Sequence, residues 1–276
     1  MGVLRLVHPF PSLLDAAVTA VFVLLAGGSG GGALLLGSAM LGLQFAIGAL
    51  NHLVDQRDDA VAKPRKPLPA GLVSRRTAGA VVVLGAGYGL TISAAAGSAV
   101  LLVAVLGSGL GLAYDLRLKR TVWAWLPYAL ALPLIPAYAW LFATGSLPPR
   151  YPLLAVLGLL AGIALATANG LVDAGTDRVA GSRGIAVALG RTRSLVAIAS
   201  SEALLLVIAV LTLLAAPVVS APALAAVAGA AGFFAVGVAL SSEAGPAGTA
   251  RRELGWEIQA VGVGLLAAGW FAAQLA

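Results

Sequence analysis

Long apolar segments separated by short polar ones make up almost the whole of this 276-residue chain. Each long segment approaches the length of about 20 residues that a helix needs to cross a bilayer. None shows the alternating, strand-length pattern of an outer-membrane barrel. The predicted spans are residues 13–31, 33–51, 77–96, 98–114, 123–142, 151–169, 195–214, 222–240 and 255–275. The pattern therefore predicts an all-α membrane protein with nine transmembrane helices in a bundle around a central cavity.

The composition agrees with this pattern. Hydrophobic residues make up 60% of the chain and charged residues only 10%, whereas a soluble domain has roughly 25% charged residues. No cysteine is present, which excludes disulfide bonds, thiolate catalysis and cysteine-based metal sites. We therefore expect an integral membrane protein whose helices contact membrane lipid.

The 17 Lys and Arg residues are distributed unevenly among the predicted connections. We number each connection by the span that it follows. Only Arg150 falls in an odd-numbered connection, and the others precede the first span or lie in even-numbered connections. Because cytoplasmic loops are enriched in Lys and Arg, we expect a cytoplasmic N-terminus. The abundant Ala, Gly, Leu and Val are typical of a GC-rich bacterial gene and so of a bacterial cytoplasmic membrane. Basic residues divided among short loops argue against a nucleic-acid partner.

One polar pattern occurs twice. Asn51, Asp55 and Asp59 are spaced by four, and Asn169, Asp173 and Asp177 repeat the pattern 118 positions later. The offset crosses four predicted spans, and because this number is even, the two arrays run in the same direction across the membrane. We therefore predict one membrane domain, 1–276, built from parallel four-helix repeats at about 1–121 and 122–240 plus a ninth helix at about 255–275. Both arrays are expected on the cytoplasmic side, facing one cavity.

A spacing of four places each set of three side chains on one stripe of a helix. An Asp at the centre of a lipid-facing helix costs about 2.5 to 3.5 kcal/mol on insertion scales, so these carboxylates are expected to line a polar cavity that holds cations. Carboxylate and amide oxygens without cysteine favour a hard cation such as Mg²⁺. The pattern predicts a magnesium shell made by both arrays.

Basic residues follow each array. Lys63, Arg65 and Lys66 follow the first, and Arg178 and Arg183 follow the second. Protein-bound Mg²⁺ usually completes its coordination with substrate phosphates, and Lys and Arg neutralise the remaining phosphate oxygens. A diphosphate with a hydrophobic tail in the membrane fits this combination, and an isoprenyl diphosphate has that form.

Three stretches of the chain resemble motifs of the UbiA-type intramembrane prenyltransferases, in the same order and over nearly the whole length. The first array with residues 63–71, Lys-Pro-Arg-Lys-Pro-Leu-Pro-Ala-Gly, resembles the first Asp-rich motif and its N-K-P-x-R-P-I-P-S-G loop. Residues 114–120, Tyr-Asp-Leu-Arg-Leu-Lys-Arg, resemble Y-S-x-x-L-K-R. Residues 173–190 resemble the second Asp-rich motif with its basic continuation. Two departures are Lys66 in place of the loop's usual Arg, and His8-Pro9 in place of Arg-Pro near the N-terminus.

The resemblance implies a prenyltransferase that ionises an isoprenyl diphosphate with Mg²⁺ and passes the allylic cation to a lipophilic acceptor. It implies catalytic carboxylates at Asp55, Asp59, Asp173 and Asp177, which form the metal shell together with Asn51 and Asn169. The substrate-binding residues that it implies are Asn51, Asn169, Lys63, Arg65, Lys66, Tyr114, Lys119, Arg120 and Arg178.

Several polar residues have two interpretations. Gln44, seven residues before Asn51 on the same helix face, touches substrate or bonds a neighbouring helix. Asp58 is interpreted as a solvated helix-end charge rather than a metal ligand. Asp115 is expected to pair with Lys119 on the surface. For Asp15 and Glu202, a functional cavity residue and a structural hydrogen bond are equally supported.

Three functions remain open from the sequence. The first is prenyl transfer from an isoprenyl diphosphate to an aromatic or other lipophilic acceptor, with release of diphosphate. The second is a membrane terpene cyclase that uses the same ionisation without an external acceptor. The third is a cation transporter, although transporter sites usually lie near the membrane midplane rather than beside basic loops at one face. The sequence identifies neither the acceptor, the prenyl chain length nor the oligomeric state.

Overall fold

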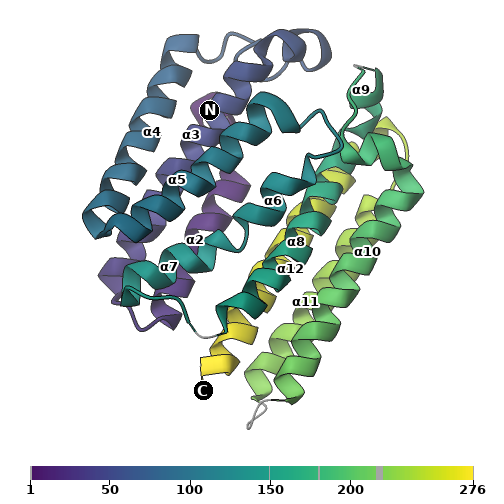
Figure 1. The fold of residues 1–276 in the computed structure, drawn as a ribbon. Coiled ribbons are helices and arrows are strands. Elements are labelled where there is room, and N and C mark those ends of the chain that lie inside the picture. Colours follow the sequence, from purple (N-terminus) through teal and green to yellow (C-terminus); the bar gives the residue numbers. More distant parts are fainter. Residues whose placement is uncertain (1, 149, 180, 216–219, 276) are drawn as a thin grey trace. The chain divides into compact units, whose positions relative to one another are not determined.

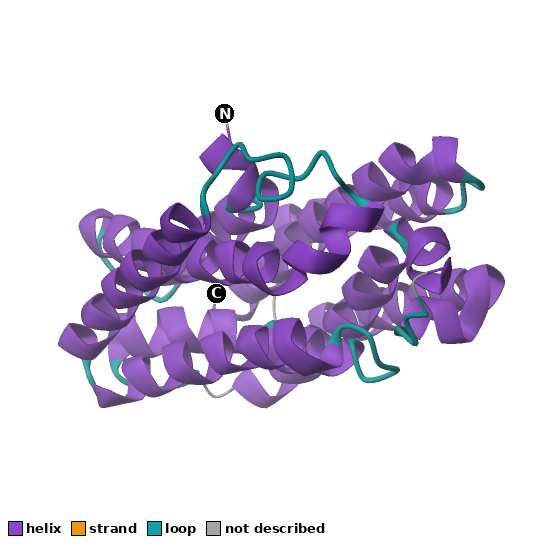
Figure 2. Cartoon of the chain, turned by 90° about the horizontal axis from the view of Figure 1, so that it is seen from above, coloured by secondary structure: helices purple, strands orange, loops and turns teal. Residues whose placement is uncertain are grey.

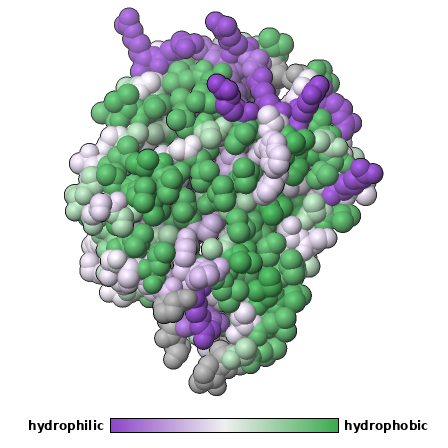
Figure 3. All heavy atoms as spheres, in the orientation of Figure 1, coloured by the Kyte–Doolittle hydropathy of each residue, from purple (hydrophilic) through white to green (hydrophobic). Residues whose placement is uncertain are grey.

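The computed structural model describes residues 2–148, 150–179, 181–215 and 220–275. Every regular element in these residues is a helix (Figure 2). Within these residues, eight helices are long and apolar enough to cross a membrane, and hydrophobic side chains cover most of the face shown in Figure 3. The all-α membrane fold is confirmed. The count of nine spans is not, because the first predicted span corresponds to the shorter apolar helix Pro9–Leu25, which has 17 residues.

The helices, which are labelled in Figure 1, belong to two compact units. The first unit comprises Met1–Arg117 and Leu134–Leu147, and the second comprises Leu118–Pro133 and Pro148–Ala276. The helices of the first are α1 (Gly2–Leu6), α2 (Pro9–Leu25), α3 (Gly30–Ala62), α4 (Arg75–Ala96), α5 (Ser98–Ala113) and α7 (Leu134–Thr144). Those of the second are α6 (Trp125–Ala131), α8 (Tyr151–Val172), α9 (Ala174–Val179), α10 (Ile185–Leu214), α11 (Ala221–Ser241) and α12 (Thr249–Leu275), with the short 3-10 helix η2 (Pro246–Gly248). The predicted sequence repeat stays a prediction.

In the first unit, small residues let the helices approach closely. A Cβ at Gly42 on α3 would lie 2.9 Å from the carbonyl oxygen of Gly85 on α4, so neither helix has room for a larger residue there. Such small-residue contacts are the usual means of packing helices in lipid. The N-terminal residues Leu6 and Val7 are buried against Ala49 of α3 and Leu68 of the loop that follows it. This cluster fixes the loop after α3 to the helix that carries the first array.

The predicted fifth span, 123–142, is interrupted. Helix α6 ends at Ala131 and α7 begins at Leu134, and the two pieces belong to different units. Pro133 lies between them, and a proline has no N–H to donate within a helix. The phenol of Tyr151 donates a hydrogen bond of 3.0 Å to the Pro133 carbonyl oxygen, which satisfies an acceptor at the break. The predicted span contains three prolines, Pro127, Pro133 and Pro136, and the chain leaves the helix at the second of them.

In the second unit, α8 packs against α6, α10 and α12. Its buried core includes Ala164, Ala168 and Leu171 of α8 with Ile198 of α10. Helix α10 begins ten residues before the predicted span at 195. It is kinked at Gly190, where φ is 73°, a backbone conformation that only glycine adopts without strain. Gly190, which lies between two predicted spans, is therefore a kink within a longer helix.

Candidate active site

The first array lies on the last turns of α3. The helix continues to Ala62, beyond the predicted end of the span at residue 51, so Asn51, Asp55 and Asp59 are parts of one continuous helix. A spacing of four in a continuous helix places them on one face, as predicted. Asp59 is buried, whereas Asn51 and Asp55 are half-buried. Asp58 is exposed, which agrees with its interpretation as a solvated charge.

The basic loop folds back onto this array. The backbone N–H of Lys63 donates to the Asp59 carbonyl oxygen at 2.8 Å and ends the helix, and the N–H of Lys66 donates to the Lys63 carbonyl oxygen at 3.0 Å. This turn brings Lys66 Nζ to 2.8 Å from Asp59 Oδ2. Asp59 is only 6% exposed, so Lys66 balances a nearly buried charge. The side chain of Arg65 is exposed.

A π-helix, η1 (Tyr114–Leu118), follows α5 and contains Asp115, a residue predicted to lie on the surface. Asp115 is 2% exposed rather than on the surface, and its Oδ1 accepts a hydrogen bond of 2.6 Å from Asn51 Nδ2. The predicted surface position was wrong because Asp115 is turned into the first unit, and its pairing with Lys119 stays a prediction. Single turns of π-helix are frequent at functional sites. Asp115 holds the amide of Asn51 so that Asn51 Oδ1 is left as the acceptor atom of that side chain.

Two histidines lie beside the first array. His8 adopts a left-handed backbone conformation with φ 47° immediately before Pro9, and its ring stacks on that of His52 with the ring centres 5.0 Å apart. Desolvation by the surrounding chain, with the neighbouring His52 and Lys66, lowers the pKa of His8 to about 4. His8 is therefore uncharged at neutral pH, unlike the arginine in the motif that it resembles.

The second array is not on one helix, contrary to the prediction. Helix α8 ends at Val172, Asp173 is non-helical with φ −107° and ψ 7°, and α9 begins at Ala174. Asn169 lies on α8 and Asp177 on α9. The carbonyl oxygen of Asp173 accepts the N–H of Asp177 and the hydroxyl of Thr176, both at 2.9 Å. Asp173 is thus the residue that joins the two helices.

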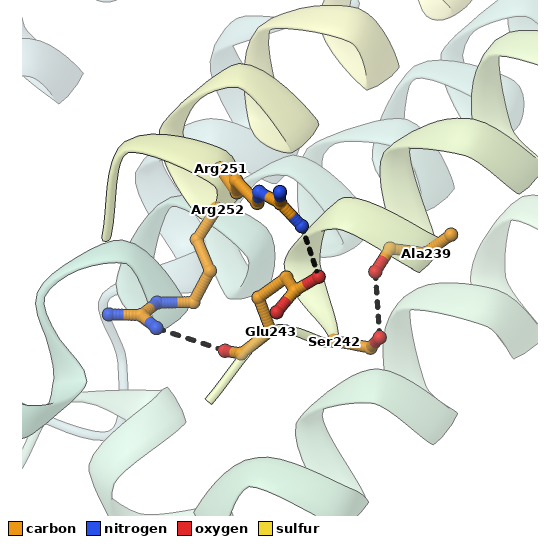
Figure 4. A network of polar contacts seen from close by, with 5 residues as sticks. All are labelled: Ala239, Ser242, Glu243, Arg251 and Arg252. Atoms are coloured by element: carbon orange, nitrogen blue, oxygen red, sulfur yellow. Dashed lines mark hydrogen bonds and ion pairs between the residues drawn. The ribbon is translucent and has the colours of Figure 1, made fainter. Parts of the chain in front are cut away.

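Arg252 on α12 explains the break at Asp173. Its Nη2 donates to the carbonyl oxygen of Val172 at 3.2 Å, and its Nη1 donates to the carbonyl oxygens of Glu243 and Gly245, each at 3.0 Å. Figure 4 shows Arg252 and its neighbour Arg251, which forms an exposed ion pair with Glu243 at 2.7 Å. A cation at the C-terminal carbonyls of a helix is favourable. No local pattern indicates this contact, since 80 residues separate Arg252 from Val172.

Other contacts in the second unit gather its predicted site residues. The amide of Asn169 donates to the phenol oxygen of Tyr128 on α6 at 3.1 Å. The N–H of Arg183 donates to the carbonyl oxygen of Arg120 at 3.0 Å, which places the segment with Lys119 and Arg120 beside the loop that follows the second array. The side chain of Arg178 is exposed.

The donor set of each array suits magnesium. In the part of the chain that the structure describes, no group of three or more His, Asp or Glu side chains is close enough to hold a metal ion. Each array offers two carboxylates and one amide oxygen, and Mg²⁺ commonly takes only one or two carboxylates and completes its shell with water and substrate phosphate. The residues therefore fit a metal that binds together with a phosphorylated substrate.

The chain is thus an all-helical membrane protein with two arrays that each contain one Asn and two Asp. A basic loop is folded onto the first array. The chain matches the model of the UbiA prenyltransferase family over residues 16–254. It belongs to the UbiA prenyltransferase family, and the predicted enzyme class is confirmed. No match was found among curated protein sequences.

Solved structures share this fold. A UbiA homologue from Aeropyrum pernix K1 in its apo form is 21% identical, with a TM-score of 0.76 over 94% of this chain and 96% of that chain. A UbiA homologue from Archaeoglobus fulgidus bound to GPP and Mg²⁺ is 18% identical, with a TM-score of 0.71 over 99% of this chain and 100% of that chain. A digeranylgeranylglyceryl phosphate synthase is 16% identical, with a TM-score of 0.70 over 99% and 98%.

We expect Arg252→Gln to lower activity and Arg251→Gln to leave it within about twofold. Arg252 is half-buried and donates one hydrogen bond to the last residue of α8, and a hydrogen bond to a charged group contributes about 1.5 to 3 kcal/mol. Arg251 makes an exposed pair, which contributes about 1 kcal/mol or less. Initial rates of diphosphate release from the two purified variants compare the sites directly. Equal rates would show that Arg252 does not position Asp173.

Proposed function

We propose that this protein transfers an isoprenyl group from an isoprenyl diphosphate to a lipophilic acceptor and releases diphosphate, with Mg²⁺ as the cofactor. The observation that carries the proposal is the contact between Lys66 and Asp59 at the end of the carboxylate array on α3, in a member of the UbiA prenyltransferase family. A structural relative, the Archaeoglobus fulgidus homologue, is described as bound to GPP and Mg²⁺, which supports this choice of substrate and metal.

The chain's own residues suggest how the diphosphate is bound. Asn51, Asp55 and Asp59 would hold one metal, and Asn169, Asp173 and Asp177 would hold another. When bound, Mg²⁺ supplies the positive charge that stabilises the departing diphosphate. Lys66 already lies at the array, and a phosphate oxygen in place of Asp59 Oδ2 would keep its ammonium paired.

The remaining basic residues are assigned by their positions in the chain. Lys63 ends α3 one turn after Asp59, and Arg178 follows Asp177 directly. Lys119 and Arg120 lie beside the loop that follows the second array. We propose that these residues and Arg65 bind the diphosphate, and that Tyr114, the first residue of η1, positions the substrate.

The location of the reaction follows from the distribution of charge. Fixed cations stabilise the charge that builds on the leaving diphosphate, while apolar helices keep water from the allylic cation. We propose that both arrays act at the cytoplasmic face, because the basic residues that follow them lie in connections rich in Lys and Arg.

Detergent-purified protein supplied with labelled geranylgeranyl diphosphate tests the proposal. We expect diphosphate release to require Mg²⁺, to stop on addition of EDTA and to return when Mg²⁺ is restored in excess. With a lipid extract from bacterial membranes present, the label should appear in a larger lipophilic product. Cyclised hydrocarbon formed without any acceptor would show a terpene cyclase instead. Absence of diphosphate release with Mg²⁺ present would refute both enzymatic proposals.

A further inference from the structure

The asparagine of each array has its amide nitrogen bound to an oxygen atom of the same unit. Asn51 Nδ2 donates to Asp115 Oδ1 at 2.6 Å, and Asn169 Nδ2 donates to the phenol oxygen of Tyr128 at 3.1 Å. Among the described residues, no group donates a hydrogen bond to Oδ1 of either asparagine. The amide oxygen is the atom of asparagine that binds a hard metal ion, so both side chains keep their ligand atom available.

The two acceptors differ in chemistry. An ionised carboxylate can only accept hydrogen bonds, whereas a phenol can donate as well as accept. Beside Asp115, the amide of Asn51 must therefore present its nitrogen to the carboxylate. Beside Tyr128, the amide of Asn169 can turn over and accept the phenol proton with its oxygen. Hydrogen bonds to ionised groups are also shorter and about twice as strong as neutral ones, in agreement with the shorter contact to Asp115.

The burial of Asp115 is unfavourable unless the carboxylate has a role. Of the five residues of η1, Asp115 is the buried one and is 2% exposed, whereas the neighbouring Leu116 is 51% exposed. A charged group is costly to bury unless it is paired or hydrogen-bonded. The π-helical turn thus directs the carboxylate inward and leaves the leucine outside, which packing alone would reverse.

We propose that Asp115 fixes Asn51 as a metal ligand and thereby makes the first array the tighter of the two metal sites. The identity of the metal, Mg²⁺, comes from the proposed function, on which this assignment rests. Removal of a group that orients a metal ligand lowers metal affinity by about 10- to 100-fold. The carboxylate of Asp115 also offsets the positive charge that Lys66 brings to Asp59. Asp115 is a positioning residue, because it acts on the metal through Asn51.

Binding of Mn²⁺ alone tests the difference between the sites without substrate. Mn²⁺ takes the same oxygen ligands as Mg²⁺, and its EPR signal reports the free ion. We expect detergent-purified protein to bind Mn²⁺ at two classes of site whose dissociation constants differ by about 10-fold or more. Asp173→Asn, in the second array, should remove the weaker class alone. Asp115→Asn keeps the size of the side chain and should weaken the tighter class by about 10-fold, so that the two classes merge.

An exchange of the two side chains and a matched control separate positioning from stability. Asn51→Asp combined with Asp115→Asn restores one amide and one carboxylate with their places exchanged, and it should restore the tighter class. Ser93→Ala removes a buried hydrogen bond of 2.7 Å between Ser93 of α4 and Tyr138 of α7 in the same unit. It should lower the Tm and leave both Mn²⁺ dissociation constants unchanged. A lower Tm in Asp115→Asn with unchanged Mn²⁺ binding would show that Asp115 is a structural residue alone.

Diphosphate release from geranylgeranyl diphosphate with Mg²⁺, measured in the same preparations, separates the two proposals. If the unmodified protein releases none while it binds Mn²⁺ in two classes that Asp115→Asn merges, the proposed function is wrong and the role of Asp115 stands. If release is normal but Mn²⁺ binds in a single class or not at all, the role of Asp115 is overturned alone. Two classes that Asp115→Asn leaves unchanged would overturn it as well.

Discussion

Asp55→Asn is expected to reduce diphosphate release by at least about 10²-fold, the loss found when one group that stabilises a transition-state charge is removed. The substitution keeps the volume of the side chain and its position on α3, and it removes the charge in the middle of the first array. The variant should fold and insert normally, because Asp55 is half-buried at the end of a long apolar helix. Single-turnover release of labelled diphosphate at saturating Mg²⁺ measures the effect.

The neighbouring carboxylate supplies the control for this prediction. Asp58→Asn makes the same chemical change three residues later on an exposed side chain, and we expect diphosphate release within about twofold of normal. Asp173→Asn should resemble Asp55→Asn, since it occupies the equivalent position of the second array. Normal release in Asp55→Asn, or an equal loss in Asp58→Asn, would remove Asp55 from the proposed metal shell.

The common face of the first array, which the sequence predicted and the structure shows, is a local property of the chain. A spacing of four between Asn51, Asp55 and Asp59 determines their common face once the segment is a helix, whatever the rest of the protein does. The short loop between Asp59 and Lys66 likewise limits how far the two charges can separate. The membrane fold followed from hydrophobic length and composition, because the bilayer requires helices of a fixed length.

The parts that the sequence did not predict depend on tertiary contacts. The hydrogen bond from Asn51 to Asp115 joins residues 64 positions apart, and nothing in either segment indicated it. The second array was predicted to continue as a helix, but the end of α8 is bonded to Arg252 of α12 and the chain turns at Asp173. In the sequence, Arg252 is one of the Lys and Arg residues whose distribution predicts a cytoplasmic N-terminus. Spacing thus indicates helix faces, and it does not indicate where distant side chains end a helix.

The packing of α6 on α8 leads to the second large effect that we expect, a loss of stability in Gly162→Ala. A Cβ at Gly162 of α8 would overlap backbone atoms of Ala129 and Tyr128 on α6, so the two helices must separate. Overpacking of this kind costs about 1 to 3 kcal/mol. Gly232→Ala on α11 is the control, because a Cβ there has nothing within 4 Å and alanine favours a helix more than glycine does. We expect a lower Tm in detergent for the first variant and an unchanged or higher Tm for the second.

The same substitution connects this packing to the site. Tyr128 of α6 accepts the hydrogen bond from Asn169 of the second array, and α6 can keep that contact only while it lies against Gly162. Gly162→Ala should therefore also raise the KM for the prenyl diphosphate at temperatures where the variant is still folded. Tyr128→Phe removes the hydroxyl but leaves the helices in place, so it should raise KM with little change in Tm. If Gly162→Ala lowered Tm without changing KM, the position of α6 would matter for folding alone, and the contact between Tyr128 and Asn169 would not support substrate binding.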